Sequence, residues 1–106
     1  KAILPERLPV QTQLLPNYPN PFNPETWIPF ELSQDSGVSV TIYNVAGTLI
    51  RSISVGYLQA GSYVSQSRAI YWDGKTDSGE SVASGTYFYT LTAQDYTSTQ
   101  KMIILK

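Results

Sequence analysis

Apolar and polar residues alternate with a period of two along much of this chain, from residue 27 almost to the end. This period is typical of β-strands that bury one face and leave the other in water. Within residues 86–93, for example, Tyr87, Tyr89, Leu91 and Ala93 share one face. No stretch shows the 3.6-residue period of a capped amphipathic helix, so we expect minimal helix. Strands are expected within residues 27–32, 38–43, 49–55, 63–72, 86–93 and 97–105, with room for a short one at 80–82.

Turn signals separate these stretches. All seven glycines lie between Gly37 and Gly85, and we expect a turn at residues 44–47 and loops at 56–61 and 73–85. Six or seven short strands, about 8 to 12 residues apart, predict an all-β fold, an antiparallel β-sandwich. The strand at 86–93 and the apolar end of the last strand are expected to lie centrally.

The prolines are confined to the first 29 residues, and the densest group lies in residues 17–24, Asn-Tyr-Pro-Asn-Pro-Phe-Asn-Pro. Proline fixes φ, lacks an N–H and pushes the preceding residue towards extended conformations, so this segment can be neither helix nor central strand. Its asparagine amides can bond to nearby backbone groups, which leaves Tyr18 and Phe22 as apolar anchors. Pro29 likewise confines its own strand to an edge or a strand start. We interpret residues 17–24, called the clamp below, as a rigid lead-in held on the β-domain and as a recognition element.

Composition and charge reduce the number of possible functional classes. The 106 residues suffice for one domain, and 42% of them are hydrophobic, as in globular folds. The net charge is −1 without runs of like charge, so we expect neither nucleic-acid binding nor membrane insertion. Cysteine and histidine are absent, which removes disulfides, the commonest general base and the best nucleophile. We therefore expect no enzyme. Residues 1–13 are interpreted as a linker to an upstream domain.

The loop after Trp72 is acidic, with three carboxylates and two glycines in residues 73–80. Calcium takes oxygen ligands from flexible acidic loops, so Asp73, Asp77 and Glu80 are candidates for calcium. Their spacing does not match an EF-hand loop, however, and Asp-Gly and Ser-Gly are ordinary turn sequences. We favour structural turns, and we expect no metal or other cofactor.

Eight tyrosines and two tryptophans raise the alternative of sugar binding. Alternation places most of them in strands, where aromatic residues pack as cross-strand pairs, so a structural role is favoured. Trp72 is expected in the core, and Trp27 is expected to seal one end of the sandwich against the clamp. Tyr87 and Tyr89 follow directly after Ser84-Gly85, and they resemble the corner tyrosine of immunoglobulin-type folds, whose hydroxyl bonds back to the main chain.

Four motifs occur in order and together resemble a known family. They are the clamp, Trp72-Asp73-Gly74, Val-Ala-Ser-Gly-Thr-Tyr-Phe-Tyr at 82–89, and Lys101-Met102. The sequence from residue 14 to residue 106 resembles the immunoglobulin-like C-terminal sorting domain of type IX secretion cargo. The same fold is shared with the immunoglobulin-like domain of the flagellar hook-capping protein.

The resemblance implies an immunoglobulin-like sandwich of six to seven strands over residues 14–106, following the linker 1–13. It further implies a non-catalytic sorting or anchoring module of an exported multidomain bacterial protein, secreted or at the cell surface. Its partner would be the outer-membrane secretion machinery, reading the clamp, an exposed sheet edge and the last strand. Two alternatives remain open: a surface assembly or docking module that binds another β-domain, and a carbohydrate-binding module. The candidate recognition residues are Asn17, Tyr18, Pro19, Asn20, Pro21, Phe22, Asn23, Pro24 and Lys101.

Overall fold

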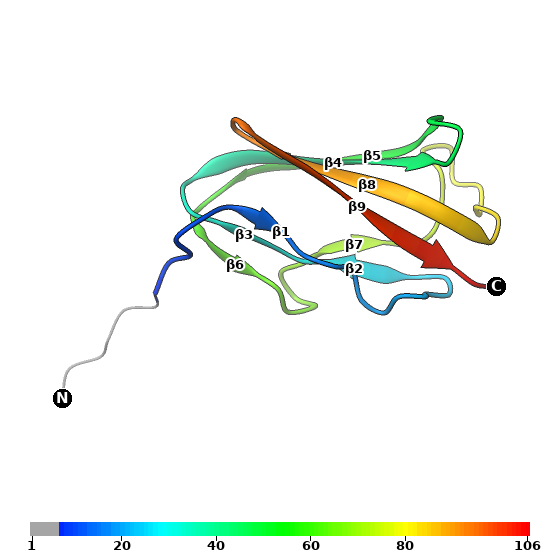
Figure 1. The fold of residues 1–106 in the computed structure, drawn as a ribbon, viewed down its shortest axis with the longest axis horizontal. Helices are drawn as coiled ribbons and strands as arrows, with labels where there is room; N and C mark the ends of the chain where they lie inside the picture. The colour runs from blue at the N-terminus through cyan, green and yellow to red at the C-terminus, as the bar shows by residue number, and fades with distance from the viewer. Residues whose placement is uncertain (1–6) are drawn as a thin grey trace.

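The computed structural model describes residues 7–106 and contains nine β-strands (Figure 1). No helix occurs within residues 7–106, so none in this range is long and apolar enough to cross a membrane. The all-β class expected from the sequence is confirmed. The strands are β1 (Gln13–Leu14), β2 (Thr26–Ile28), β3 (Phe30–Leu32), β4 (Ser36–Asn44), β5 (Leu49–Leu58), β6 (Gly61–Tyr63), β7 (Ile70–Trp72), β8 (Gly85–Ala93) and β9 (Tyr96–Ile104).

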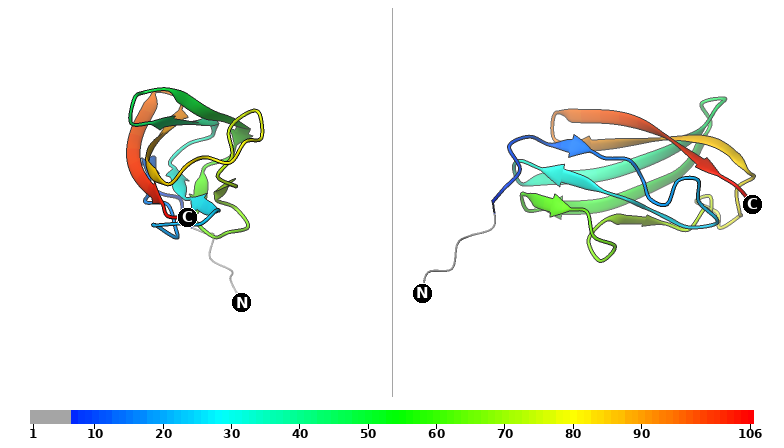
Figure 2. Two further views of the ribbon diagram at one scale, coloured as in Figure 1. Left: turned by 90° about the vertical axis from the view of Figure 1, so that its right-hand side faces the viewer. Right: turned by 60° about the horizontal axis from the view of Figure 1, so that its bottom comes forward.

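The strands form two layers, which the turned views show most clearly (Figure 2). One layer is a four-stranded antiparallel sheet in the order β5-β4-β8-β9. The other layer combines a three-stranded sheet, β1-β3-β6, with the two-stranded sheet β2-β7. In the first layer, short turns join β4 to β5 and β8 to β9, and the chain passes through β6 and β7 of the second layer between β5 and β8.

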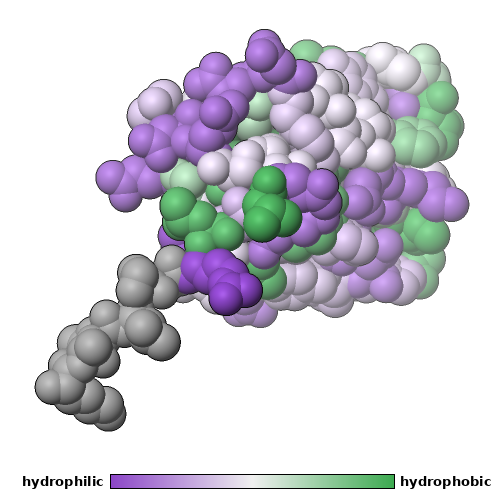
Figure 3. Space-filling model, turned by 60° about the vertical axis from the view of Figure 1, so that its left-hand side comes forward, coloured by the Kyte–Doolittle hydropathy of each residue, from purple (hydrophilic) through white to green (hydrophobic). Residues whose placement is uncertain are grey.

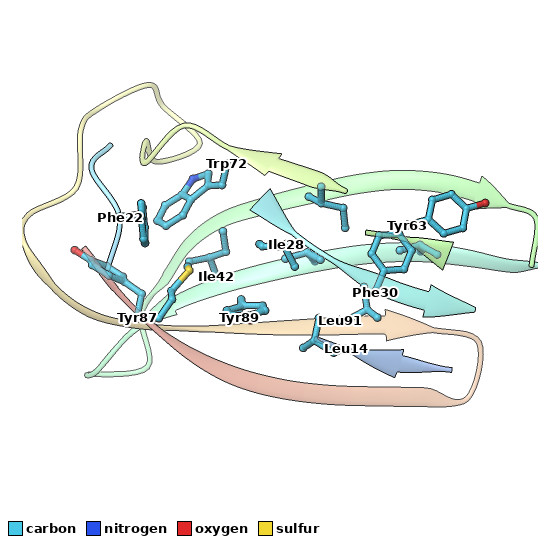
Figure 4. Close-up of a cluster of buried hydrophobic side chains, with 14 of the residues drawn as sticks. Leu14, Phe22, Ile28, Phe30, Ile42, Tyr63, Trp72, Tyr87, Tyr89 and Leu91 are labelled. Carbon is cyan, nitrogen blue, oxygen red and sulfur yellow. The ribbon is translucent and has the colours of Figure 1, made fainter. Parts of the chain in front are cut away.

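The core lies between the two layers (Figure 4). The alternation in β8 has the expected result, since Tyr87, Tyr89, Leu91 and Ala93 are all buried. Trp72 of β7 is only 1% exposed and lies in the core, where the sequence analysis expected it. The remaining buried hydrophobic residues are Leu14, Phe22, Ile28, Phe30, Leu32, Val38, Val40, Ile42, Tyr63, Ile70, Val82, Met102 and Ile104.

The strand expected at residues 27–32 is in fact two strands in different sheets. Pro29 lies between β2 and β3, and its carbonyl accepts a hydrogen bond from Leu15 N at 3.1 Å. Because proline has no N–H for a ladder, the chain passes from one small sheet to the other at this residue. Short strands of this kind explain why the structure has nine strands where six or seven were expected, since two or three residues are too few to show a period.

Two further expectations are wrong, and a strand that the sequence left possible does not form. The last strand, β9, is an edge strand of its sheet and not a central one, although β8 is central as expected. Residues 56–58 continue β5, because Gly56 has a φ of 103° beside a register shift in the β4–β5 ladder and so marks a bulge rather than a turn. Residues 80–82 form no strand, only a single bridge between Lys75 and Ser81.

The sandwich begins slightly before residue 14. Gln13 pairs with Glu31, and its Nε2 donates to Glu31 Oε1 at 2.7 Å. The Thr12 and Ser33 hydroxyls lie 3.2 Å apart. Residues 7–10 make no such contacts, and Leu8 and Val10 are exposed. Hydrophobic (green) and hydrophilic (purple) atoms lie side by side on the face of the molecule that Figure 3 shows. Residues 1–6 lie outside the described range, and the linker interpretation stays a prediction.

Candidate functional site

The clamp lies along the outer edge of β9 and pairs with it. Phe22 N donates to Ile103 O at 3.0 Å, and Leu105 N donates to Phe22 O at 3.0 Å. These bonds make a parallel bridge between Phe22 and Ile104. Asn20 adds a side-chain contact, since its Oδ1 accepts from Ile103 N at 2.9 Å. The clamp therefore closes the end of an edge strand that would otherwise be open to another chain.

Phe22 anchors this joint in the core. It is 2% exposed, and its ring centroid lies 5.7 Å from that of Trp72 (Figure 4). Gly74 makes the close approach of the clamp possible, because a Cβ at this position would lie 2.5 Å from Pro24 O. Its φ of 77° is also one that glycine adopts readily. The Trp72-Asp73-Gly74 motif thus supplies both the ring under the clamp and the space beside it.

The start of the clamp is tied to β8 through a buried tyrosine. Tyr89 OH accepts from Asn17 N at 2.8 Å and donates to Leu15 O at 3.0 Å. Burial raises the pKa of Tyr89 to about 12. The Asn17 side chain is buried as well, and its Nδ2 donates to Thr26 Oγ1 and to Pro19 O. The Tyr89 hydroxyl connects the start of the clamp to the centre of the large sheet, and the Asn17 side chain connects it to β2.

Tyr87 ties a different loop to the main chain. Its hydroxyl donates to Ala83 O at 2.8 Å, four residues upstream, in the manner of a corner tyrosine. Burial raises the pKa of Tyr87. Its ring lies against Trp72, with the centroids 6.1 Å apart and the rings close to perpendicular. Both Tyr87 and Tyr89 therefore fix backbone segments around the clamp.

The asparagines of the clamp differ from one another. Asn17 bonds locally, as expected, but Asn20 reaches the main chain of β9 across 83 residues of sequence. The expectation that all three asparagine amides fold back onto nearby backbone is thus wrong for Asn20. Asn23 is exposed, and so is Lys101, which stands beside Phe88 in the β8–β9 ladder. The exposed clamp residues are Pro19, Asn20, Pro21, Asn23 and Pro24.

Three aromatic side chains lie on the outer face of the layer that contains β2 and β7. The Trp27 ring has the Tyr18 ring on one side, at 6.4 Å between centroids, and the Tyr71 ring on the other, at 5.5 Å. Trp27 lies beside the clamp, as expected, but it is half-buried on the outer face. Tyr71 was not among the candidate residues, although its position between buried Ile70 and Trp72 indicates an outward side chain.

The acidic loop braces the edge of β5. Arg51 lies 3.5 Å from Asp73 Oδ1 through Nη1, and 3.5 Å from Asp77 Oδ1 through Nε. Asp77 also bonds the edge directly, since its N donates to Ile50 O and its Oδ1 accepts from Ser52 N. Across residues 7–106, no three His, Cys, Asp or Glu side chains form a group that could hold a metal. Glu80 lies exposed outside these contacts, and the expectation that this loop forms structural turns without calcium stays a prediction.

The described part of the chain has no pocket in which a small substrate could be enclosed. Residues 22–97 match the FlgD Ig-like domain family, which is more than half of the chain. This chain belongs to the FlgD Ig-like domain family. The immunoglobulin-like sandwich expected from the sequence is thereby confirmed, and the family together with the small all-β fold indicates a non-catalytic module. No curated protein matches the chain.

Two solved structures from Porphyromonas gingivalis share the fold. Dimeric latent PorU is 22% identical with a TM-score of 0.65, over 89% of this chain and 9% of PorU. PorZ, an essential surface component of the type IX secretion system, is 19% identical with a TM-score of 0.56, over 88% of this chain and 11% of PorZ. The chain therefore spans about a tenth of the length of each protein.

Proposed function

We propose that this chain is a non-catalytic sorting or anchoring module of an exported multidomain bacterial protein, recognised by a protein partner at the cell surface. The observation that carries this role is the joint between the clamp and β9, which unites the beginning and the end of the domain in one surface. The fold shared with a domain-sized part of PorZ is consistent with a setting in type IX secretion.

The partner would read an assembled surface. The clamp covers the edge of β9 near Ile103, so this part of the edge is not available for direct strand addition. The exposed clamp residues and the exposed Lys101 remain for contact, together with Leu105, which is 57% exposed. Recognition of this surface therefore requires the folded domain and not a linear peptide.

Export of a passenger protein tests this role. Residues 14–106 fused behind a passenger should carry it to the cell surface in a host with type IX machinery. Removing residues 101–106 should abolish export, because it deletes buried Met102 and Ile104 together with the partner of the clamp.

A milder substitution separates recognition from folding. Lys101→Ala changes an exposed side chain and should alter the free energy of unfolding by less than about 0.5 kcal/mol. We expect reduced export with unchanged melting, whereas Lys75→Ala, which alters an exposed lysine in the acidic loop, should export normally. Normal export of Lys101→Ala would remove Lys101 from the recognition surface, and failure of the intact fusion would refute the sorting role.

A docking module for another β-domain is the second proposal, and the edge of β5 favours it. Within the described range, residues 53–58 form backbone hydrogen bonds only in the β4–β5 ladder, and Tyr57 among them is 72% exposed. An open edge of this kind can pair with a strand of another chain. If the intact fusion stays in the periplasm while the folded domain binds another β-domain, docking is the correct role. Tyr57→Lys should then weaken that binding.

A further inference from the structure

The outward face of the β2–β7 sheet carries three large aromatic rings, which is unusual for a surface in contact with solvent. Tyr18, Trp27 and Tyr71 form a continuous row of rings, called the aromatic row below. Trp27 pairs directly with Tyr71 across the sheet and makes a bridge to Tyr18. Tyr71 is 48% exposed, and Tyr18 and Trp27 are half-buried. Large aromatic side chains that remain outside a finished core are enriched at binding surfaces.

The two outer rings are held in place by their hydroxyl groups. Tyr18 OH donates to Val64 O, and Tyr71 OH donates to Glu25 Oε1 at 2.7 Å. The hydrogen bond to Glu25 also raises the pKa of Tyr71. Rings that are fixed before a ligand arrives lose little conformational entropy on binding. A role in sheet pairing alone would not need either hydroxyl to be fixed.

The polar groups beside the row restrict the chemistry of the ligand. Both tyrosine protons are already committed, while the exposed Glu25 carboxylate keeps further acceptor capacity. The prolines of a proline-rich peptide present carbonyl acceptors but no N–H groups, so such a peptide offers a carboxylate fewer donors than a sugar does. Sugar hydroxyls both donate and accept, and they can bond to the carboxylate and to the tyrosine oxygens.

Shape and charge restrict the ligand further. No pocket exists in the described part of the chain, so the row is an open platform that suits an extended polymer lying across it. The negative charge of Glu25 disfavours phosphate, sulfate or uronate groups. The C–H bonds on the face of a pyranose ring carry partial positive charge and are attracted to the negative face of an aromatic ring. From these observations, we propose that the aromatic row binds a neutral, pyranose-containing polysaccharide.

This binding would be a further activity of the module, and it does not depend on the sorting role. It gives an exported protein a contact with polysaccharide on the face opposite the large sheet, away from Lys101. The aromatic rings assigned to the core from the sequence, such as Trp72 and Tyr89, take no part in it.

Native affinity electrophoresis of residues 1–106 tests the proposal. Gels containing hydroxyethylcellulose, laminarin or galactomannan serve as neutral polysaccharides, and gels containing pectin serve as the acidic comparison. We expect retardation in at least one neutral gel and none in pectin. Tyr71→Ala should weaken the retardation about tenfold, the loss expected for one stacked ring. Tyr71→Phe keeps the ring and should retain most of the binding.

The matched control is Tyr57→Ala, which removes an exposed aromatic ring on β5, and it should bind as the wild type does. A second measurement needs no variant: the neutral polysaccharide that retards the chain should protect half-buried Trp27 fluorescence from iodide. Absence of retardation in every neutral gel would overturn the proposal, as would equal weakening by Tyr57→Ala and Tyr71→Ala. If a polyproline peptide protects Trp27 and no polysaccharide does, the row is a peptide-binding surface and the proposal is wrong.

Discussion

The joint between the clamp and β9 gives the most direct test of the structure, through substitution of Phe22 by alanine. The Phe22 ring is 2% exposed and packs on Trp72, so its removal deletes a buried ring and leaves a cavity. Phe→Ala substitutions in cores typically cost about 3 to 5 kcal/mol. Domains of this size are stable by only about 5 to 15 kcal/mol, so Phe22→Ala should lower the urea midpoint severely.

A second substitution shows whether the cost arises from the joint itself. Asn20→Ala removes one hydrogen bond to Ile103 N and should cost about 1 kcal/mol. Phe22 and Asn20 act on the same stretch of β9, so their effects should not add. Once Phe22→Ala has released the clamp, Asn20→Ala should cost almost nothing more. Phe22→Leu, which keeps an apolar side chain in place, should cost clearly less than Phe22→Ala.

Equilibrium urea unfolding, followed by tryptophan fluorescence, measures the free energy of unfolding of the wild type, the two alanine variants, their double variant and Phe22→Leu. Wild-type stability in Phe22→Ala would show that the clamp is not packed on the sandwich in solution. Fully additive costs in the double variant would show that Asn20 and Phe22 stabilise the domain separately, and the picture of one cooperative joint would fail.

Three further predictions concern other parts of the molecule. In single-tryptophan variants, iodide should quench the fluorescence of half-buried Trp27 strongly and that of Trp72, which is 1% exposed, weakly. Stronger quenching of Trp72 would show that the described position of β7 is wrong. Tyr89 has a folded pKa of about 12 against roughly 10 unfolded, so its stabilisation is complete below pH 10 and is lost as the pH rises towards 12. Tyr89→Phe should reduce this alkaline loss in denaturation measurements, while it costs about 1 to 3 kcal/mol at neutral pH. Millimolar calcium and a chelator should give the same melting temperature, and a calcium-dependent rise that Asp77→Ala abolishes would contradict this.

The sequence predicts the long strands well because each buries one face over many residues. In β8 the alternation of Tyr87, Tyr89, Leu91 and Ala93 places four residues in the core without ambiguity. Short strands give no such signal, and for this reason the change of sheet at Pro29 was not predicted. A local pattern also cannot distinguish a bulge from a turn, since both use glycine, and Gly56 was therefore placed in a loop.

The sequence identified the residues of the candidate site but not the contacts that they make. The clamp was recognisable from its prolines, which constrain only neighbouring residues. Its pairing with Ile103 and Leu105 leaves no trace in a local pattern, because the partners are about 80 residues away. The outward position of Tyr71 was available from its place between Ile70 and Trp72, yet its meeting with Tyr18 depends on how the clamp is folded.

The pairing of the clamp with β9 also sets an order of events during biosynthesis. Residues 17–24 leave the ribosome before β9 does, and their hydrogen-bonding partners are made about 80 residues later. Until then Phe22 has no strand to pair with, and the edge of β8 that later pairs with β9 is open. The nascent domain therefore cannot close before β9 is complete, and its folding has to wait for the end of its own synthesis.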